Sequence, residues 1–489
     1  MLRDYNQKNS KMRSTICLPF ILLFTTFQVA FAQSKEVKFA AADVKTDLAY
    51  LYNTLQEAHY NLYAYVSKNK YDKAYRNLVK SVGEDSVSLL ETTKLFQKLA
   101  ATGNAGHCEV DFAVQPYIAF AQDGGMVFPL ELAFENGKAY VRKSYTSNTA
   151  IAPGDQLQSI NGKPIGQIQK AIHPYLSAER VYFKNAKLEF WSFPRLYWST
   201  FGARDTFIVK VKKATGKTES YTLEAIPVMT YETERGGEIL SAAPTFSYHN
   251  EVAYLNPGPF SSSAADGEQQ FKAYIDSVFA DIHQKKANTL ILDLRNHAGG
   301  HNAYSDHLIS YFADKPFRWF SSFQIKTSKV LKEHTLKNTP DTTDAYTKAI
   351  LSHQNGETFA YDQPMQNPVP AARRFKGKVY VLINRQTYSM AAVSAALIQD
   401  YGFAELVGEE TGDVPTLYAS QFSFPLPKTG IIAKVPKGYI VRPNGNEKLA
   451  GVKPDYVVAD HLLAGEDEIL NYTLYTLLNK KMPEQASVK

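Results

Sequence analysis

The feature that most constrains the fold is an apolar strand that runs directly into a helix of small residues. Residues 378–383 read as the strand, and residues 388–399, rich in Ala and Ser, read as the helix after a tight turn. A continuous apolar strand of this kind is typical of a sheet that is buried on both faces. From about residue 250 onward such segments alternate, which predicts an α/β core. The other predicted segments are strands at 252–255, 289–294 and 404–407 and a helix at 268–284.

The part before this core divides into a helical and a β-rich region. Apolar residues recur at helical spacing in residues 41–104, which predicts a small helical bundle. Short strands and Gly-bearing turns follow from about residue 125 and include a predicted hairpin at 207–223. The aromatic segment 182–201 is interpreted as a local core, with a lid or substrate-facing surface as the alternative. Residues 325–372 are polar and read as an excursion from the sheet.

The first 32 residues have the pattern of a signal peptide. A basic stretch ends near Arg13, an apolar run follows, and Ala30-Phe31-Ala32 precedes Gln33 as a cleavage site. A retained N-terminal anchor is the alternative, and Met12 is a possible start. No later run of 18 apolar residues follows, so we expect an exported protein without an integral membrane span. Whether export ends in the periplasm or outside the cell stays open.

Length and composition exclude several classes. The 489 residues suggest two to four domains, and 44% hydrophobic with 21% charged residues is ordinary for a globular protein. The formal charge of +6 comes without a run of Lys and Arg interleaved with aromatics, so nucleic acid is not an expected partner. After signal cleavage only Cys108 remains, so we expect no disulfide.

Ser389 is the first candidate for chemistry. It lies where the apolar strand turns into the small-residue helix. At a helix N-terminus, free backbone N–H groups and the helix dipole stabilise a developing oxyanion. The alternative is that Ser389 only caps the helix, as serines often do.

A paired glycine follows the strand at 289–294. Gly299 and Gly300 let the backbone approach a ligand, so their N–H groups are candidate oxyanion donors together with that of Met390. Alternatively the two glycines only turn the chain. Asp293 and Arg295, just before them, are interpreted as a structural ion pair.

Further motifs accompany these two windows. They are the Gly-His turn 103–107, Asp293-Leu-Arg295 before Gly299-Gly300, Thr387-Tyr-Ser389, Val407-Gly-Glu-Glu-Thr-Gly412 and Gly451-Val-Lys-Pro-Asp455. Taken together, they resemble the tail-specific (C-terminal processing) serine peptidases, in particular the branch similar to the tricorn-protease core. The resemblance covers roughly residues 40–465, and the motifs occur in the order of that family.

The resemblance implies a crotonase-like α/β core (a spiral sheet plus helices), an N-terminal helical bundle and a PDZ-like β-rich domain. The expected boundaries are a signal peptide at 1–32, the bundle at 33–112, the PDZ-like domain with its aromatic insertion at 113–228 and the protease core at 229–489.

The resemblance also implies the catalytic residues. Ser389 is the expected nucleophile and His107 the expected general base, because one branch of the family places a histidine at the end of the helical bundle. The other branch uses a lysine, but Asp413 occupies that position here. Glu447 is the candidate acid that orients or polarises the site, although it lies one position off the alignment, and a solvated loop carboxylate is the alternative.

Two further positions depart from the family pattern. Gly106 stands where the tricorn branch has a serine, and His297 stands where the family has an asparagine. These departures leave open a weakened or altered peptidase.

The sequence therefore predicts an exported serine endopeptidase that acts on unfolded or tail-exposed polypeptides without a cofactor. The rival hypothesis is a catalytically weak or inactive protein on the same scaffold that binds peptides or hydrophobic ligands. No metal site is expected, because Gly299-Gly300 lie between His297 and His301 and argue against a helix that would place both histidines on one face. The candidate ligands are His297, His301, Asp306 and His307. The oligomeric state is left open.

Overall fold

The computed structural model describes residues 36–236, 243–339, 341–461 and 466–479. Its largest α/β layer is a six-stranded sheet in the order β12-β13-β14-β17-β18-β21. Only the β12–β13 pair is antiparallel, and the remaining neighbours are parallel. The strands are β12 (Thr245–His249), β13 (Val252–Asn256), β14 (Thr289–Asp293), β17 (Lys378–Ile383), β18 (Glu405–Gly408) and β21 (Tyr456–Val457).

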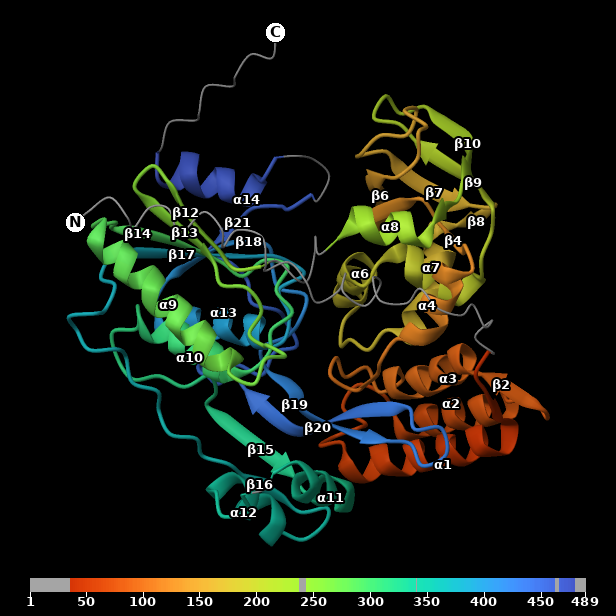
Figure 1. Ribbon diagram of the computed structural model, residues 1–489, viewed down its shortest axis with the longest axis horizontal. Coiled ribbons are helices and arrows are strands. Elements are labelled where there is room, and N and C mark those ends of the chain that lie inside the picture. Colours follow the sequence, from red (N-terminus) through yellow and green to blue (C-terminus); the bar gives the residue numbers. More distant parts are fainter. Residues whose placement is uncertain (1–35, 237–242, 340, 462–465, 480–489) are drawn as a thin grey trace, which may run out of the picture. The chain divides into compact units, whose positions relative to one another are not determined.

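This sheet is covered on both faces, which explains its apolar strands. Val379, Val381 and Ile383 point into the core that helices α9 (Gly267–Gln284), α10 (Asn302–Ser310) and α13 (Met390–Tyr401) share. Tyr380 and Leu382 point the other way, toward α14 (Glu468–Asn471) and the π-helix Tyr472–Leu477. Figure 1 shows α9, α10 and α13 on one side of the strands and α14 on the other. Each buried Val or Leu contributes about 1.5–3 kcal/mol.

A second sheet joins the α/β core to the N-terminal helices. Its order is β16-β15-β20-β19, and the short strand β3 (Glu109–Val110) pairs with β20. The turn of residues 102–108 connects α3 (Leu89–Ala101) to β3. The pairing of β3 with β20 therefore holds this turn against the core. The sheet consists of β15 (Ser322–Lys326), β16 (Thr358–Ala360), β19 (Leu417–Pro425) and β20 (Ile432–Val441).

The β-rich region forms a third sheet, in the order β10-β9-β7-β6-β5 with β8 paired to β7. The predicted hairpin appears as β9 and β10. The aromatic segment forms α6 and α7, and most of its rings are buried, so its interpretation as local core is confirmed. The elements are β5 (Leu130–Glu135), β6 (Lys138–Ser144), β7 (Gln156–Ile160), β8 (Lys163–Pro164), α5 (Ile165–Ile172), α6 (Val181–Phe190), α7 (Phe193–Phe201), β9 (Thr206–Lys212) and β10 (Thr218–Glu224).

The predicted helical region is confirmed, and the Ser88 side chain accepts a hydrogen bond from the Glu91 amide at the start of α3. Residues 325–372 leave the six-stranded sheet, as predicted, and the excursion is ordered: β15 and β16 pair with each other, and β15 pairs with β20 in the second sheet. The remaining elements are β1 (Lys38–Ala40), α1 (Ala41–Ala58), α2 (Lys68–Ser81), β2 (Ser86–Ser88), α4 (Val114–Gln122), β4 (Met126–Val127), η1 (His173–Tyr175), β11 (Ile226–Pro227), α8 (Val228–Arg235), α11 (Lys329–Asn338) and α12 (Ala345–Ser352).

The predicted signal peptide and its cleavage site at Ala32-Gln33 lie outside the described residues. Within the described ranges, every helix is too short or too polar to cross a membrane.

Candidate active site

Ser389 occupies a strained turn at the start of α13. Its backbone has φ 53° and ψ −128°, a region that residues with a side chain rarely adopt. Ser389 is the N-cap residue of α13, but its side chain makes no capping hydrogen bond to any residue of this helix, all of which the structure describes. The interpretation of Ser389 as a simple cap is therefore wrong, because the turn aims the hydroxyl away from the helix.

The Ser389 hydroxyl faces His107. Oγ of Ser389 lies 3.0 Å from Nε2 of His107, although the two residues are 282 positions apart in the chain. His107 is 4% exposed, and its ring stacks on Tyr388 with centroids 5.1 Å apart. The structure thus brings together the two side chains that the sequence motifs single out, within hydrogen-bonding distance for proton transfer.

The surroundings of His107 favour its neutral form. Burial and the positive charge of Lys187 lower its pKa to about 3. Lys187 is itself buried in α6, where Nζ donates to the Gly106 carbonyl (3.2 Å) and to the Glu109 carboxylate (2.8 Å). A neutral imidazole is the form that accepts a proton from a hydroxyl.

The Asp413 carboxyl group accepts hydrogen bonds from the backbone of the Ser389 turn and of its own loop. Its Oδ2 accepts the Ser389 backbone N–H at 2.8 Å, and its Oδ1 accepts that of Val414 at 2.9 Å. Asp413 is fully buried, and burial together with the charge of Glu179 raises its pKa to about 8. The carboxyl that stands in the place of a lysine therefore holds the backbone of the turn.

Gly299, the first residue of the glycine pair, lies against the same turn. Gly299 has φ 84°, and a Cβ built on it would lie 2.6 Å from the Met390 nitrogen, so only glycine fits. The Gly299 N–H, however, donates to His297 Nδ1 at 2.9 Å and is already occupied. This leaves the N–H groups of Gly300 and Met390 as candidate oxyanion donors.

Glu447 does not join this site. Its carboxylate accepts the Tyr439 hydroxyl at 2.7 Å on an exposed loop, and no contact among the described residues links it to His107. The interpretation of Glu447 as a solvated loop carboxylate is the one that the structure supports.

The lysines that might replace His107 as base are engaged elsewhere. Lys434 pairs with Asp111, and Lys437 donates to the Ser420 carbonyl, both at distances of 2.5 to 2.7 Å. The Lys428 backbone N–H donates to Asp47, which places Lys428 beside α1. Among the described residues, the Ser389 side chain contacts His107 and its backbone N–H contacts Asp413, and none of these lysines forms a hydrogen bond with it.

The four candidate metal ligands also point to separate partners. His297 accepts from Gly299, and His301 accepts from Ala303 as the cap of α10. Asp306 accepts from Asn302, and His307 contacts Asp276. Over the part of the chain that the structure describes, no group of three or more such side chains is placed to hold a metal ion.

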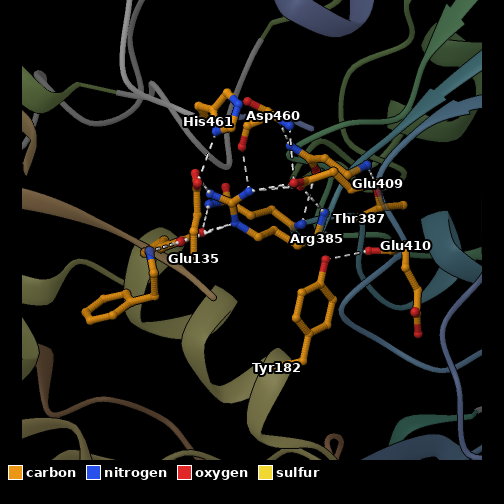
Figure 2. Close-up of polar contacts among 12 residues, drawn as sticks. Glu135, Tyr182, Arg385, Thr387, Glu409, Glu410, Asp460 and His461 are labelled. Carbon is orange, nitrogen blue, oxygen red and sulfur yellow. Dashed lines mark hydrogen bonds and ion pairs between the residues drawn. The ribbon is translucent and has the colours of Figure 1, made fainter. Parts of the chain in front are cut away.

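A buried arginine anchors the loop that leads to Ser389. Arg385 is 3% exposed and contacts the carboxylates of Glu189 and Glu409 at 2.9 Å. Figure 2 shows it surrounded by acidic groups, with Glu135 and Asp460 nearby. Because Glu189 belongs to α6, this cluster ties the β-rich region to the loop before Ser389.

Replacing Arg385 by Met is therefore expected to lower the free energy of unfolding by about 3–5 kcal/mol, because it leaves buried carboxylates without their cation. Urea unfolding followed by circular dichroism measures the loss. The matched control is Arg318→Met, which breaks the exposed pair with Asp362 and should cost less than about 1 kcal/mol. Equal losses in the two variants would contradict a structural role of the Arg385 cluster.

Two charged side chains of this site carry no recognisable motif. Glu179 and Lys187 both come from the segment around α6, where the sequence shows mainly aromatic residues. Glu179 accepts the Gly106 N–H at 2.6 Å, and Lys187 contacts the same turn. Spacing along the chain offers no way to find them, since they reach the site only through packing.

Comparison with known proteins gives a family match and a shared fold. Residues 251–458 match the model of Peptidase family S41, a range that includes Ser389 but not His107. No curated protein matches the sequence. Mature CPAF has 14% identity over 85% of this chain and 92% of its own, with a TM-score of 0.59. CPAF complexed with lactacystin has 14% identity over 85% and 93%, with a TM-score of 0.60. This likeness shows the same mixed α/β fold over most of both chains.

Proposed function

We propose that this protein, a serine peptidase of family S41 through its domain at residues 251–458, cleaves peptide bonds with Ser389 as nucleophile and His107 as general base. The observation that carries the assignment is the 3.0 Å contact between Ser389 Oγ and His107 Nε2. It is supported by the strained backbone of Ser389, which directs the hydroxyl at the imidazole instead of the helix.

The reaction follows from the geometry. His107 Nε2 takes the hydroxyl proton while Ser389 Oγ attacks the scissile carbonyl carbon. The N–H groups of Gly300 and Met390 would stabilise the oxyanion, because Met390 follows Ser389 at the start of α13 and Gly300 follows Gly299, which lies against that turn. His107 then passes the proton to the leaving amine, and water, activated by the same imidazole, releases the acyl group from Ser389.

The substrate would be an unfolded or tail-exposed polypeptide. The third sheet with helix α5 supports a PDZ-like role for residues 113–228, in which an extended peptide adds to the sheet as a further strand. The parallel sheet flanked by helices is the part that we assign to a crotonase-like core. Export through residues 1–32 belongs to the same proposal. The rival binding protein is not favoured, because a binding site needs no serine hydroxyl aimed at a buried imidazole.

A fluorophosphonate probe tests the assignment directly. We expect covalent labelling of Ser389 in the wild-type protein, mapped by mass spectrometry, and none in Ser389→Ala, because only an activated hydroxyl attacks phosphorus readily. Cys108→Ala is the matched control: Cys108 follows His107 in the chain, but burial raises the pKa of its thiol, so this variant should label like the wild type. Labelling at another residue, or no labelling of folded wild-type protein, would refute the proposal.

A further inference from the structure

Two buried polar atoms are unpaired at the proposed base and beside the residue that precedes it. His107 Nδ1 and Glu179 Oε2 are both buried without a hydrogen-bond partner among the described residues. We propose that Glu179 is the positioning residue that orients His107 through Nδ1 and stabilises the imidazolium formed during turnover. This inference rests on the proposed function, in which His107 takes the proton of Ser389.

The position of Glu179 is defined by the residue before His107. The Gly106 N–H donates to Glu179 Oε1 at 2.6 Å. A Cβ built on Gly106 would lie only 2.9 Å from Glu179 Oε2, so the carboxylate occupies the space that a side chain at position 106 would take. The departure at Gly106 therefore has a structural reason: glycine makes room for a carboxylate that comes from another segment.

The tautomer of His107 requires a partner of this kind. When Ser389 donates its hydroxyl proton to Nε2, the ring proton of neutral His107 is on Nδ1. A buried donor and a buried acceptor that both stay unpaired are costly. Glu179 is held against Gly106, the residue before His107, so a rotation of its carboxyl group or one bridging water would join Nδ1–H to Oε2 and satisfy both atoms.

Burial raises the pKa of Glu179, and the Gly106 N–H and the positive charges of Lys187 and Arg180 oppose that rise. Lys184 faces Glu179 from α6, and Asp413 faces it from the loop after β18. Tyr65 and Tyr388 also face it, from the segment after α1 and from the turn before α13. Because the pKa of Asp413 is raised to about 8, we expect the acidic pair to hold one negative charge at neutral pH, and we assign it to Glu179.

The test is Glu179→Gln, which keeps the volume and an acceptor for the Gly106 N–H but removes the charge. We expect kcat to fall about 10³–10⁴-fold with KM within about threefold, as when the acid of other serine–histidine enzymes is neutralised. The acid limb of kcat should also move to lower pH, because the imidazolium loses its counter-charge. The low-field proton resonance of His107 Nδ1–H should disappear, and Glu179→Asp should restore at least about tenfold of the activity.

A second variant approaches the same contact from the other side. Gly106→Ala places a methyl group against Oε2 and should reproduce the loss of kcat and the shift of the acid limb. Gly83→Ala, where an added Cβ meets no atom within 4 Å, is the matched glycine control. Glu57→Gln is the matched acidic control, because Glu57 also accepts a backbone N–H, that of Lys329, and should keep kcat within about threefold.

The outcomes separate the two proposals. If Ser389 is labelled and required but Glu179→Gln keeps kcat within threefold, the role of Glu179 is refuted and the nucleophile stands. A loss of kcat with an unchanged acid limb and an unchanged resonance would reduce Glu179 to a structural residue, and a loss in Glu447→Gln alone would assign the role to Glu447. Wild-type activity of Ser389→Ala would overturn the proposed function and the role of Glu179 with it.

Discussion

Ser389→Ala is expected to reduce the cleavage of unfolded casein by about 10⁶-fold in kcat, because it removes the nucleophile while oxyanion donors and substrate binding remain. The measurement is release of acid-soluble peptides over time by purified mature protein. Ser394→Ala is the matched control on the same helix: its Oγ donates to the Met390 carbonyl, so its loss should leave kcat/KM near that of the wild type.

Folding of the Ser389 variants gives an independent check. Ser389→Ala should keep its melting temperature, since the hydroxyl makes no capping bond within α13. Ser389→Gly should be equally inactive yet more stable by about 1 kcal/mol, because glycine adopts a φ of 53° without strain. Casein cleavage by Ser389→Ala at the wild-type rate would remove Ser389 from the mechanism.

His107→Ala is expected to lower kcat/KM by about a thousandfold or more, because Ser389 then lacks the group that takes its proton. The same casein assay measures the loss, and Cys108→Ala, at the neighbouring position, should retain most activity. If His107→Ala stays near wild type while one of Lys428, Lys434 or Lys437 proves essential, the serine–histidine mechanism is wrong.

The pH profile is a second readout for His107. An exposed imidazole predicts an acid limb with a pKa of about 6 to 7.5. Burial and Lys187 lower the pKa of His107, and since the neutral ring is the active form, activity should persist to below about pH 5. Above about pH 8, ionisation of Asp413 adds a negative charge beside the Ser389 N–H and should reduce the rate. Asp413→Asn should remove this alkaline limb and leave the acid limb in place.

Local sequence patterns determined much of the fold. The apolar strand and small-residue helix around residue 389 were predictable because strand and helix periodicity depend on neighbours a few residues apart. For the same reason the sequence placed Ser389 at a helix N-terminus and the glycine pair after β14. The family motifs further pointed to His107, since its turn ends the helical region in the expected order.

Only the tertiary structure decided how these parts act together. The contact of His107 with Ser389 depends on the pairing of β3 with β20, which brings the turn before β3 to the core. Sequence spacing likewise does not predict that Glu447 binds Tyr439 or that Glu179 lies beside Gly106. Burial, which lowers the pKa of His107 and raises that of Asp413, is a property of packing between segments far apart in the chain. Sequence patterns determine which side chains a segment presents, whereas long-range packing determines which of them meet and how they are charged.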